Sequence, residues 1–598
     1  MANDSAQKNQ PEAGAVWQRR VDRRTVLGGA AGAAAGILGT GVLKGRVAAA
    51  PAIIRGRPLL TRGQELPADA APLEKQILLL PAEGANVKVL DFYEKVYERG
   101  GAGDLFSEPL VRLNRNFQLQ PAAAESWSST EDGKTWTFKI RRGMVWSDGN
   151  PVTAEDYVAT LRYAADPEHA WDFTWYFQGV IAGWNDAIAG KIPLDQMGVR
   201  TGADEYELVI ETENPAPYLP AMLLYSLPLS KAALETHGPL YNTKPETAVS
   251  SGPFILAEWI PDQRIVLKRN EKYNGTMTVP VQQVIYKLST PENYFTMYQN
   301  NEIDFVENPG PAAIEIMLAD PNLAQEVFSG VADFPTYHIF FDVTKPPFDN
   351  KLVRQAWSHA IDRDAIKEKI LGPSGIPAYS WLAPGFPAAN PEGLKDIQRF
   401  DPELAKQQLA EAGYPNGEGF PKLEMWIRDK TPLDQAVPAA CASMLKEYLN
   451  IDVELVQKPA QEFMAALTAK PTQILLGWVR YGMDFFDPYN MLSVWLSGGR
   501  YSWSNPEYDA KVKAAAEFLG PTEERIKMFQ EAERILVEDV PAVFVYHGTY
   551  PQLIKPWLKG TFKEPDENGN ASLHWPGFTT MSTVPEEMYI GSDASERA

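Results

Sequence analysis

Residues 121–161 read PAAAESWSSTEDGKTWTFKIRRGMVWSDGNPVTAEDYVATL and carry the densest local structural signals in the chain. Gly133 predicts a turn, because glycine accepts a positive φ angle and the preceding Asp132 can bond its own backbone. In the six residues after Lys134, large apolar and polar side chains alternate, which indicates a strand with one buried face. Its apolar residues are Trp136, Phe138 and Ile140. Thr153 then predicts a helix N-cap, because acidic residues follow it in the electropositive first turn.

The order and spacing of these signals resemble the solute-binding proteins of ABC importers, in the branch that includes the oligopeptide- and dipeptide-binding proteins. The resemblance rests on P-x-x-A-E-S-W, then D-G-K-T-W-T-F, then R-x-G-x-x-W-S-D-G-x-P-V-T-A-E-D. It implies an α/β fold of the periplasmic-binding-protein type, with two large lobes around a hinge and an extra α/β subdomain. Three tryptophans of the stretch are expected to pack the core rather than to contact a ligand. They are Trp127, Trp136 and Trp146.

The three-lobe layout of this family predicts how the chain is divided. Lobe I is expected to combine residues 75–111, 229–332 and 547–598, lobe II to span 112–228, and lobe III to span 333–546. Within lobe III the pattern predicts a strand at 423–427, a helix at 434–449 and a strand at 451–456, and such alternation is typical of an α/β lobe. Within lobe II an apolar helix is predicted from Asn214 to Leu227, ended by Pro228.

The first fifty residues are predicted to be an export signal. Arg23 and Arg24 precede a weakly hydrophobic, Ala- and Gly-rich run, which resembles a twin-arginine signal. Cleavage is expected near Ala49 or Ala50, and the alternative is an uncleaved anchor helix. Residues 51–74 are predicted to be a linker. The signal implies export through the twin-arginine machinery to the periplasm or cell surface of a bacterium.

Charge and cysteine content exclude several other classes. The net charge is −21, and no basic cluster occurs outside the first fifty residues, so nucleic acid is not an expected partner. The single cysteine, Cys441, cannot form an internal disulfide, and no cysteine follows the apolar run to accept a lipid. The histidines lack metal-ligand spacing, and no phosphate-binding or dinucleotide-binding loop occurs. We therefore expect no metal, no cofactor and no catalytic residues.

The ligand-binding candidates follow from the resemblance. Residues 477–488, GWVRYGMDFFDP, are similar to the family's G-W and D-x-x-[D/E]-P motif at the ligand cleft. By that resemblance Asp484 would pair with the α-ammonium group of a peptide, and the segment Gly477, Trp478 and Val479 would bond its backbone. Aromatic residues are also common in ligand clefts. The aromatic candidates are Tyr97, Trp175 and Tyr176.

Two departures from the family pattern affect these assignments. Five residues separate Trp478 from Asp484 where relatives have two, and Leu475 occupies a position where oligopeptide binders carry an arginine. Arg480 is a candidate to replace that arginine. The alternative role for Asp484 is a structural carboxylate in a turn or helix cap, and the alternative for Trp478 is core packing.

The sequence therefore predicts an extracytoplasmic binding component of an ABC importer, a monomer that captures a peptide by hinge closure and delivers it to the membrane permease subunits. An oligosaccharide is the rival ligand, because sixteen tryptophans suit sugar stacking. A different class, an extracytoplasmic glycan or peptide hydrolase, stays open, because a chain with 77 acidic residues can place two carboxylates at a cleft.

Overall fold

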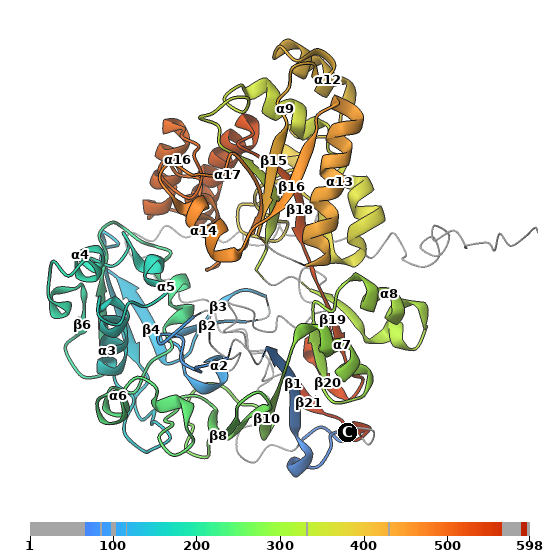
Figure 1. Cartoon of the computed structure of the whole chain (residues 1–598). Coiled ribbons are helices and arrows are strands. Elements are labelled where there is room, and N and C mark those ends of the chain that lie inside the picture. Colours follow the sequence, from blue (N-terminus) through green and yellow to red (C-terminus); the bar gives the residue numbers. More distant parts are fainter. Residues whose placement is uncertain are drawn as a thin grey trace, which may run out of the picture.

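The computed structural model describes most of the chain after its first 65 residues. The described ranges are 66–83, 87–96, 98, 103–114, 116–330, 333–428, 431–564 and 588–594. The predicted export signal, most of the predicted linker and the candidate Tyr97 lie outside these ranges. Figure 1 shows one α/β body above and a wider, two-part body below it. We name the parts by their sheets and keep the names lobe I, II and III; the exact boundaries given above stay predictions.

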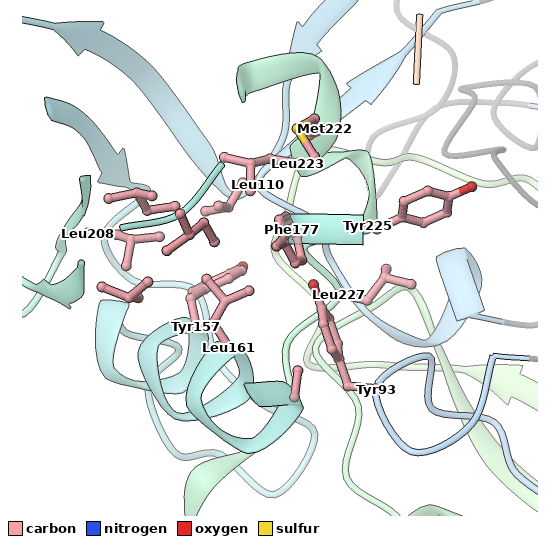
Figure 2. Packing of buried hydrophobic residues seen from close by; sticks show 14 of the residues in the cluster. Tyr93, Leu110, Tyr157, Leu161, Phe177, Leu208, Met222, Leu223, Tyr225 and Leu227 are labelled. Carbon is pink, nitrogen blue, oxygen red and sulfur yellow. The ribbon is translucent and has the colours of Figure 1, made fainter. Parts of the chain in front are cut away.

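Lobe II contains the quoted stretch and confirms its local predictions. Its sheet has the order β4-β5-β7-β6, and β5 (Thr135–Ile140) buries alternate residues as expected. The other strands are β4 (Ala124–Ser129), β6 (Val199–Thr201) and β7 (Glu207–Glu211). Helix α3 (Ala154–Ala165) begins after Thr153, whose backbone N–H donates to the Asp156 carboxylate at 3.0 Å. Side chains from α3, β7 and the segment after residue 218 meet in one apolar core (Figure 2).

One prediction for lobe II was wrong. The apolar helix expected at 214–227 is replaced by a short helix, α5 (Leu219–Met222), followed by the 3-10 turn η5 (Leu223–Tyr225). The segment is apolar all round and buried, so packing rather than helical periodicity determines its path. The aromatic-rich run 171–177, which holds the candidates Trp175 and Tyr176, contains the 3-10 turn η3 (Thr174–Phe177).

Lobe I is assembled from segments far apart in the sequence. Its sheet has the order β1-β10-β9-β8, in which β1 (Ile77–Glu83) pairs in parallel with β10 (Gln283–Ser289). Beside it, β19 (Tyr550–Ile554) lies between β11 (Phe305–Glu307) and β12 (Val327–Gly330). The remaining elements are β8 (Phe254–Ile260), β9 (Arg264–Arg269), α7 (Pro291–Gln299), α8 (Pro311–Ala319), β20 (Leu558–Gly560) and β21 (Met588–Ile590). The C-terminal segment therefore returns to the first strands of the fold (Figure 1).

Lobe III is built on a mixed sheet with the order β14-β18-β13-β17-β15-β16. Its strands are β13 (Thr336–Phe341), β14 (Gly375–Pro377), β15 (Leu423–Ile427), β16 (Val453–Gln457), β17 (Leu476–Tyr481) and β18 (Ala542–Gly548). Its longer helices are α9 (Lys351–His359), α12 (Pro402–Glu411), α13 (Pro432–Leu449), α14 (Ala460–Thr468), α16 (Pro506–Glu517) and α17 (Thr522–Asp539). The sheet separates two apolar cores, and the thiol of Cys441 in α13 is buried in one of them. The predicted strand-helix-strand pattern is confirmed within two residues.

The shorter elements complete the chain. They are β2 (Val111–Leu113), β3 (Leu119–Pro121), α2 (Gly103–Phe106), α4 (Trp184–Ile188), α6 (Lys231–His237), α10 (Arg363–Ile366), α11 (Pro391–Leu394) and α15 (Pro488–Ser493). Within the described ranges, no helix combines the length and apolar character that a membrane span requires. The same ranges hold no group of three or more metal-ligating side chains.

Two chain connections link lobe I to lobe III, and the hinge that the resemblance implies is expected there. One runs from the end of β12 at Gly330 to the start of β13 at Thr336, and the other from the end of β18 at Gly548 into β19. They are bonded to each other, because the Gly548 N–H donates to the Pro335 carbonyl at 2.9 Å. Movement of lobe III against the rest of the molecule must therefore be absorbed at these paired segments.

Candidate ligand-binding site

The candidate motif occupies β17 and the loop that follows it. Strand β17 lies inside the lobe III sheet, antiparallel to β13 and parallel to β15. The carboxyl ends of β15 and β17 therefore meet at the same edge of the sheet, and ligands of open α/β sheets bind at that edge. The pairing with β13 continues to Tyr481, whereas the described pairing with β15 reaches Trp478. Gly477 and Trp478 thus have a neighbouring strand on both sides.

Trp478 lies in the core of lobe III. Its indole is 1% exposed, and its Nε1–H donates to the Asp434 carboxylate at 3.0 Å. Its ring is tilted by 34° and 33° to the rings of Tyr337 and Tyr546, at 6.0 and 6.1 Å. The side chain therefore contributes to packing, which is the alternative that the sequence left open for this residue.

The other two residues of the predicted backbone-pairing segment are also buried. A Cβ atom added to Gly477 would lie 2.4 Å from Cζ of Phe340, so the residue must be glycine for the strand to pack against that ring. The Val479 side chain belongs to the second core of lobe III, on the opposite face of the sheet from Trp478. Their role in binding a ligand backbone stays a prediction.

Asp484 lies in the loop after β17 and is 9% exposed. Its Oδ2 accepts hydrogen bonds from the Tyr481 hydroxyl at 2.7 Å and from Nδ2 of Asn490 at 3.2 Å. The loop is also held by its backbone, because the Asp484 N–H donates to Oδ1 of Asn490 at 2.8 Å. Burial raises the pKa of the Asp484 carboxyl group, against the opposing effects of these bonds and of the Arg500 charge. The site therefore presents a positioned carboxylate with little water around it.

Asp487, the second carboxylate of the motif, has a structural role. Its Oδ1 accepts from the backbone N–H of Tyr489 at 2.9 Å and so caps α15, in which Pro488 takes the first position. The same carboxylate pairs with both terminal nitrogens of Arg525 in α17, at 2.6 and 2.9 Å. Asp487 is thus the helix-capping carboxylate of the motif, while the bonds of Asp484 within its own loop are compatible with the structural turn that was the alternative for that residue.

Phe485 and Phe486, between the two carboxylates, connect lobe III to lobe II. The Phe485 ring stacks on Tyr218 at 5.9 Å and meets Tyr176 edge to face at 6.1 Å. The Phe486 ring stacks on Phe117 at 5.1 Å. Because Phe117, Tyr176 and Tyr218 all belong to the lobe II side, the loop that carries Asp484 lies directly against the opposite lobe.

The aromatic candidates from lobe II lie at different depths. Tyr176 is buried, and its hydroxyl donates to the Met222 carbonyl at 3.0 Å. Burial raises the pKa of Tyr176, and its ring meets that of Phe485, the residue after Asp484, at 6.1 Å. Trp175 is 42% exposed, and its ring meets that of Phe173 edge to face at 4.5 Å. Tyr176 is therefore brought to the loop of Asp484, whereas the described ring contacts of Trp175 lie within lobe II.

Arg480 points toward the hinge. Its Nη1 donates to the Tyr550 hydroxyl at 3.0 Å, and that hydroxyl lies 3.5 Å from the Asp333 carboxylate. The charges of Asp333 and Arg480 also act on the buried carboxyl group of Glu307. Burial and the Asp333 charge raise the pKa of Glu307 to about 8, against the opposing effect of the Arg480 charge. The expectation that Arg480 replaces the family's carboxylate-binding arginine stays a prediction, but the side chain has structural partners in this position.

Sequence reasoning missed Arg500. Its guanidinium lies over the Tyr481 ring, 4.8 Å from the ring centre, and its charge acts on Asp484. Arg500 follows the Gly498-Gly499 turn and matches no motif, so only the three-dimensional structure brings it to the carboxylate.

Comparison with known proteins finds relatives that cover most of the chain. Residues 118–503 match the family model described as bacterial extracellular solute-binding proteins, family 5 Middle. The chain is 31% identical over 520 residues to the periplasmic oligopeptide-binding protein OppA of Escherichia coli K12, an overlap that covers 84% of this chain and 93% of OppA.

Solved structures agree in fold. The Escherichia coli murein tripeptide-binding protein MppA superposes with a TM-score of 0.69 at 26% identity, covering 88% of this chain and 100% of MppA. Haemophilus influenzae OppA in complex with RPPGFSPFR gives a TM-score of 0.67 at 26% identity, covering 87% of this chain and 99% of that chain.

Proposed function

We propose, because the chain belongs to the family 5 bacterial extracellular solute-binding proteins, that it captures a peptide between its lobes and delivers it to the permease subunits of an ABC importer. The relatives with which it shares the fold are binding proteins, so we propose a binding role and no catalytic one. The proposal agrees with the α/β lobes and paired hinge segments described above.

The observation that carries the proposal is the position of Asp484. Its carboxylate is buried at the carboxyl edge of the sheet, next to two phenylalanines that touch the opposite lobe. A carboxylate with little surrounding water binds an ammonium group strongly, because the charges are poorly screened. An α-ammonium group that enters between the lobes would therefore be held here, in the role that the family motif implies.

Ligand capture then follows as a population shift. Contacts from both lobes stabilise the state in which lobes II and III touch, and the permease would distinguish this state from the open one. We further propose that the protein acts as a monomer in the periplasm or at the cell surface, after export by its twin-arginine signal. Arg23→Lys combined with Arg24→Lys should keep the chain in the cytoplasmic fraction; unchanged export would contradict that part of the proposal.

Isothermal titration tests the ligand class. A mixture of short peptides should bind, and Asp484→Asn should weaken that binding about tenfold or more, because it removes the charge that faces the ammonium group. The matched control is Asp452→Asn, which changes an exposed carboxylate of the same lobe and should leave the affinity unchanged. Equal affinity of the Asp484→Asn variant would refute the ammonium role.

The same titration also tests the two alternative functions, oligosaccharide binding and hydrolysis. The exposed indole of Trp175 is the feature that favours an oligosaccharide, because sugar rings stack on such surfaces. Binding of neutral oligosaccharides without binding of peptides would replace the proposal with that function. Recovery of cleaved peptide or glycan after long incubation would instead favour the hydrolase.

A further inference from the structure

Two phenylalanines that touch across the interlobe contact share an unusual backbone conformation. Phe117 has a φ angle of 58° and Phe334 one of 48°, and their ring centres lie 4.9 Å apart. Bulky side chains rarely take a left-handed backbone, because the Cβ atom then crowds the following carbonyl oxygen. In the described ranges the other non-glycine residues with positive φ are asparagine, aspartate or alanine, apart from Val540. Strained residues of this kind often mark a part of the molecule that moves or binds.

Phe117 lies in the turn that joins β2 to β3, and the bonds of this turn set its φ angle. The Phe117 N–H donates to the Asn114 carbonyl at 2.9 Å, and the Asn114 side chain accepts from the Gln118 N–H at 2.9 Å. Hairpin loops commonly place glycine at a left-handed position, because glycine has no Cβ atom. Glycine at position 117 would keep the same bonds, so the turn itself does not require a phenylalanine.

The ring of Phe117 enters a socket of three phenylalanine rings on the lobe III side. It stacks on Phe486 at 5.1 Å and 22°, and it meets Phe334 edge to face at 62°. Phe386 completes the group, because its ring contacts Phe334 at 5.3 Å and Phe486 at 5.2 Å. We name Phe334, Phe386 and Phe486 the phenylalanine socket. Phe117 is half-buried and packs against the apolar cores of both lobe II and lobe III.

Contacts on the lobe III side hold the socket. Phe334 is 3% exposed and belongs to one of the two apolar cores of that lobe. Its neighbours in the chain are bonded, because the Met483 N–H donates to the Asp333 carbonyl at 2.7 Å and the Gly548 N–H to the Pro335 carbonyl at 2.9 Å. A residue before a proline prefers an extended backbone, so these bonds and the ring packing keep Phe334 left-handed. The socket is therefore preformed for the ring that enters it.

We propose that Phe117 is a latch, whose strained backbone presents its ring to the phenylalanine socket and so holds lobes II and III together without the help of a ligand. Aromatic pairs contribute more than the area that they bury, so loss of this ring should shift the balance between touching and separated lobes about tenfold. The contact consists of the chain's own side chains, and it assumes nothing about what the protein binds. The strain at Phe117 lowers folding stability, and the latch is the reason that it is kept.

The test compares two variants of the whole protein that both lack the ring but differ in the backbone they allow. Phe117→Gly accepts a positive φ angle, whereas Phe117→Ala keeps the crowded Cβ atom. Small-angle scattering gives the ratio of closed molecules, with lobes II and III in contact, to open ones; rising concentrations of trimethylamine N-oxide favour closure and bring each variant into range. Both variants should lower this ratio about tenfold. Phe117→Gly should nevertheless require more denaturant to unfold than Phe117→Ala.

Two matched controls separate the latch from general effects on the fold. Ala170→Gly relieves another left-handed residue, with a φ angle of 51°, on the exposed surface of lobe II. It should change the resistance to denaturant and leave the closed-to-open ratio as it is. Phe400→Ala removes a half-buried ring that contacts Tyr448 within lobe III, and it should also leave that ratio unchanged.

The outcomes decide each part of the proposal. An unchanged closed-to-open ratio in Phe117→Gly would overturn the latch, and equal resistance of the glycine and alanine variants to denaturant would overturn the strain assigned to residue 117. Phe486→Ala removes the same stack from the socket side and should lower the ratio as much, which keeps the latch testable if Phe117→Ala does not fold. These measurements use no ligand. Failure of every peptide to bind would therefore overturn the proposed function and leave the latch in place.

Discussion

The carboxylates of Asp484 and Asp487 lie three residues apart and have different partners. Asp484 accepts bonds from the neutral groups of Tyr481 and Asn490, whereas Asp487 is paired with the guanidinium of Arg525 and caps a helix. Only the second carries an ion pair with a side chain of the same lobe. The sequence could predict that this motif matters, but the division of roles depends on which side chain folds back from α17, and that is set by tertiary packing.

Replacement of Asp487 should affect stability. Asp487→Asn leaves Arg525 buried without its counter-charge, which should lower the free energy of unfolding by about 3 kcal/mol. Denaturant unfolding measures the change. The paired variant Asp487→Asn with Arg525→Met should recover much of the loss, and a single variant as stable as the unaltered protein would contradict the assigned role.

The Glu533 carboxyl group should make the stability of the folded protein depend on pH. The residue is fully buried, its Oε1 accepts from the Leu382 N–H at 2.7 Å, and burial raises its pKa to about 8. The folded protein therefore retains a proton that the unfolded chain releases near its ordinary pKa of about 4.3. The stability contribution of this group falls as the pH rises between these two values, by up to about 1.4 kcal/mol per pH unit.

Thermal unfolding at several pH values tests this assignment. Glu533→Gln should flatten the decline between pH 5 and pH 8, because the amide carries no titrating proton. Asp452→Asn, at an exposed carboxylate, should leave the decline as it is. A decline of the same slope in Glu533→Gln would show that other groups cause it.

At the scale of elements, the sequence predicted most where local periodicity and burial agree. Strand β5 buries every second residue, and β15 begins and ends where its apolar pattern does. The segment 214–227 failed because its residues are apolar on all sides, so no face distinguishes helix from irregular packing. The same holds for the candidate site. A sequence motif singles out Asp484, whereas Arg500 lies in a loop whose sequence carries no comparable signal.

Strand β17 offers a test of packing at the element scale. Gly477→Ala places a methyl group against the Phe340 ring, and overpacking of this kind should destabilise lobe III by about 1–3 kcal/mol. Phe340→Leu in the same chain should relieve part of the strain. Chemical unfolding of the single and double variants measures the coupling, and additive effects would mean that the two residues do not press on each other.

At the scale of the molecule, the lobes meet through a small set of side chains. Phe485 packs on Tyr218 and Tyr176, and Phe486 on Phe117. A further contact joins the turn of the quoted stretch to lobe III, because a Cβ atom added to Gly133 would meet Leu519 at 2.7 Å. The sequence could not predict these contacts, since the residues on each side belong to different lobes and share no local pattern.

Removal of the contact should open the molecule. Phe485→Ala exposes apolar surface between the lobes, so the population in which lobes II and III touch should fall about tenfold, and ligand affinity with it. Small-angle scattering of the ligand-free variant should give a larger radius of gyration than the unaltered protein. Tyr448→Ala, which removes a contact with Phe400 within lobe III, should not. An unchanged radius of gyration in Phe485→Ala would contradict the proposal that the Phe485 ring stabilises the contact between lobes II and III.

The burial of Cys441 has a practical consequence for watching this motion. It is the single cysteine of the chain, its side chain is fully buried, and burial raises its pKa to about 12, so almost no reactive thiolate is present at neutral pH. Two cysteines introduced on exposed sites of lobes II and III would therefore be the only groups to react with maleimide dyes. Energy transfer between such dyes can follow opening and closing in single molecules, with the native thiol left in place.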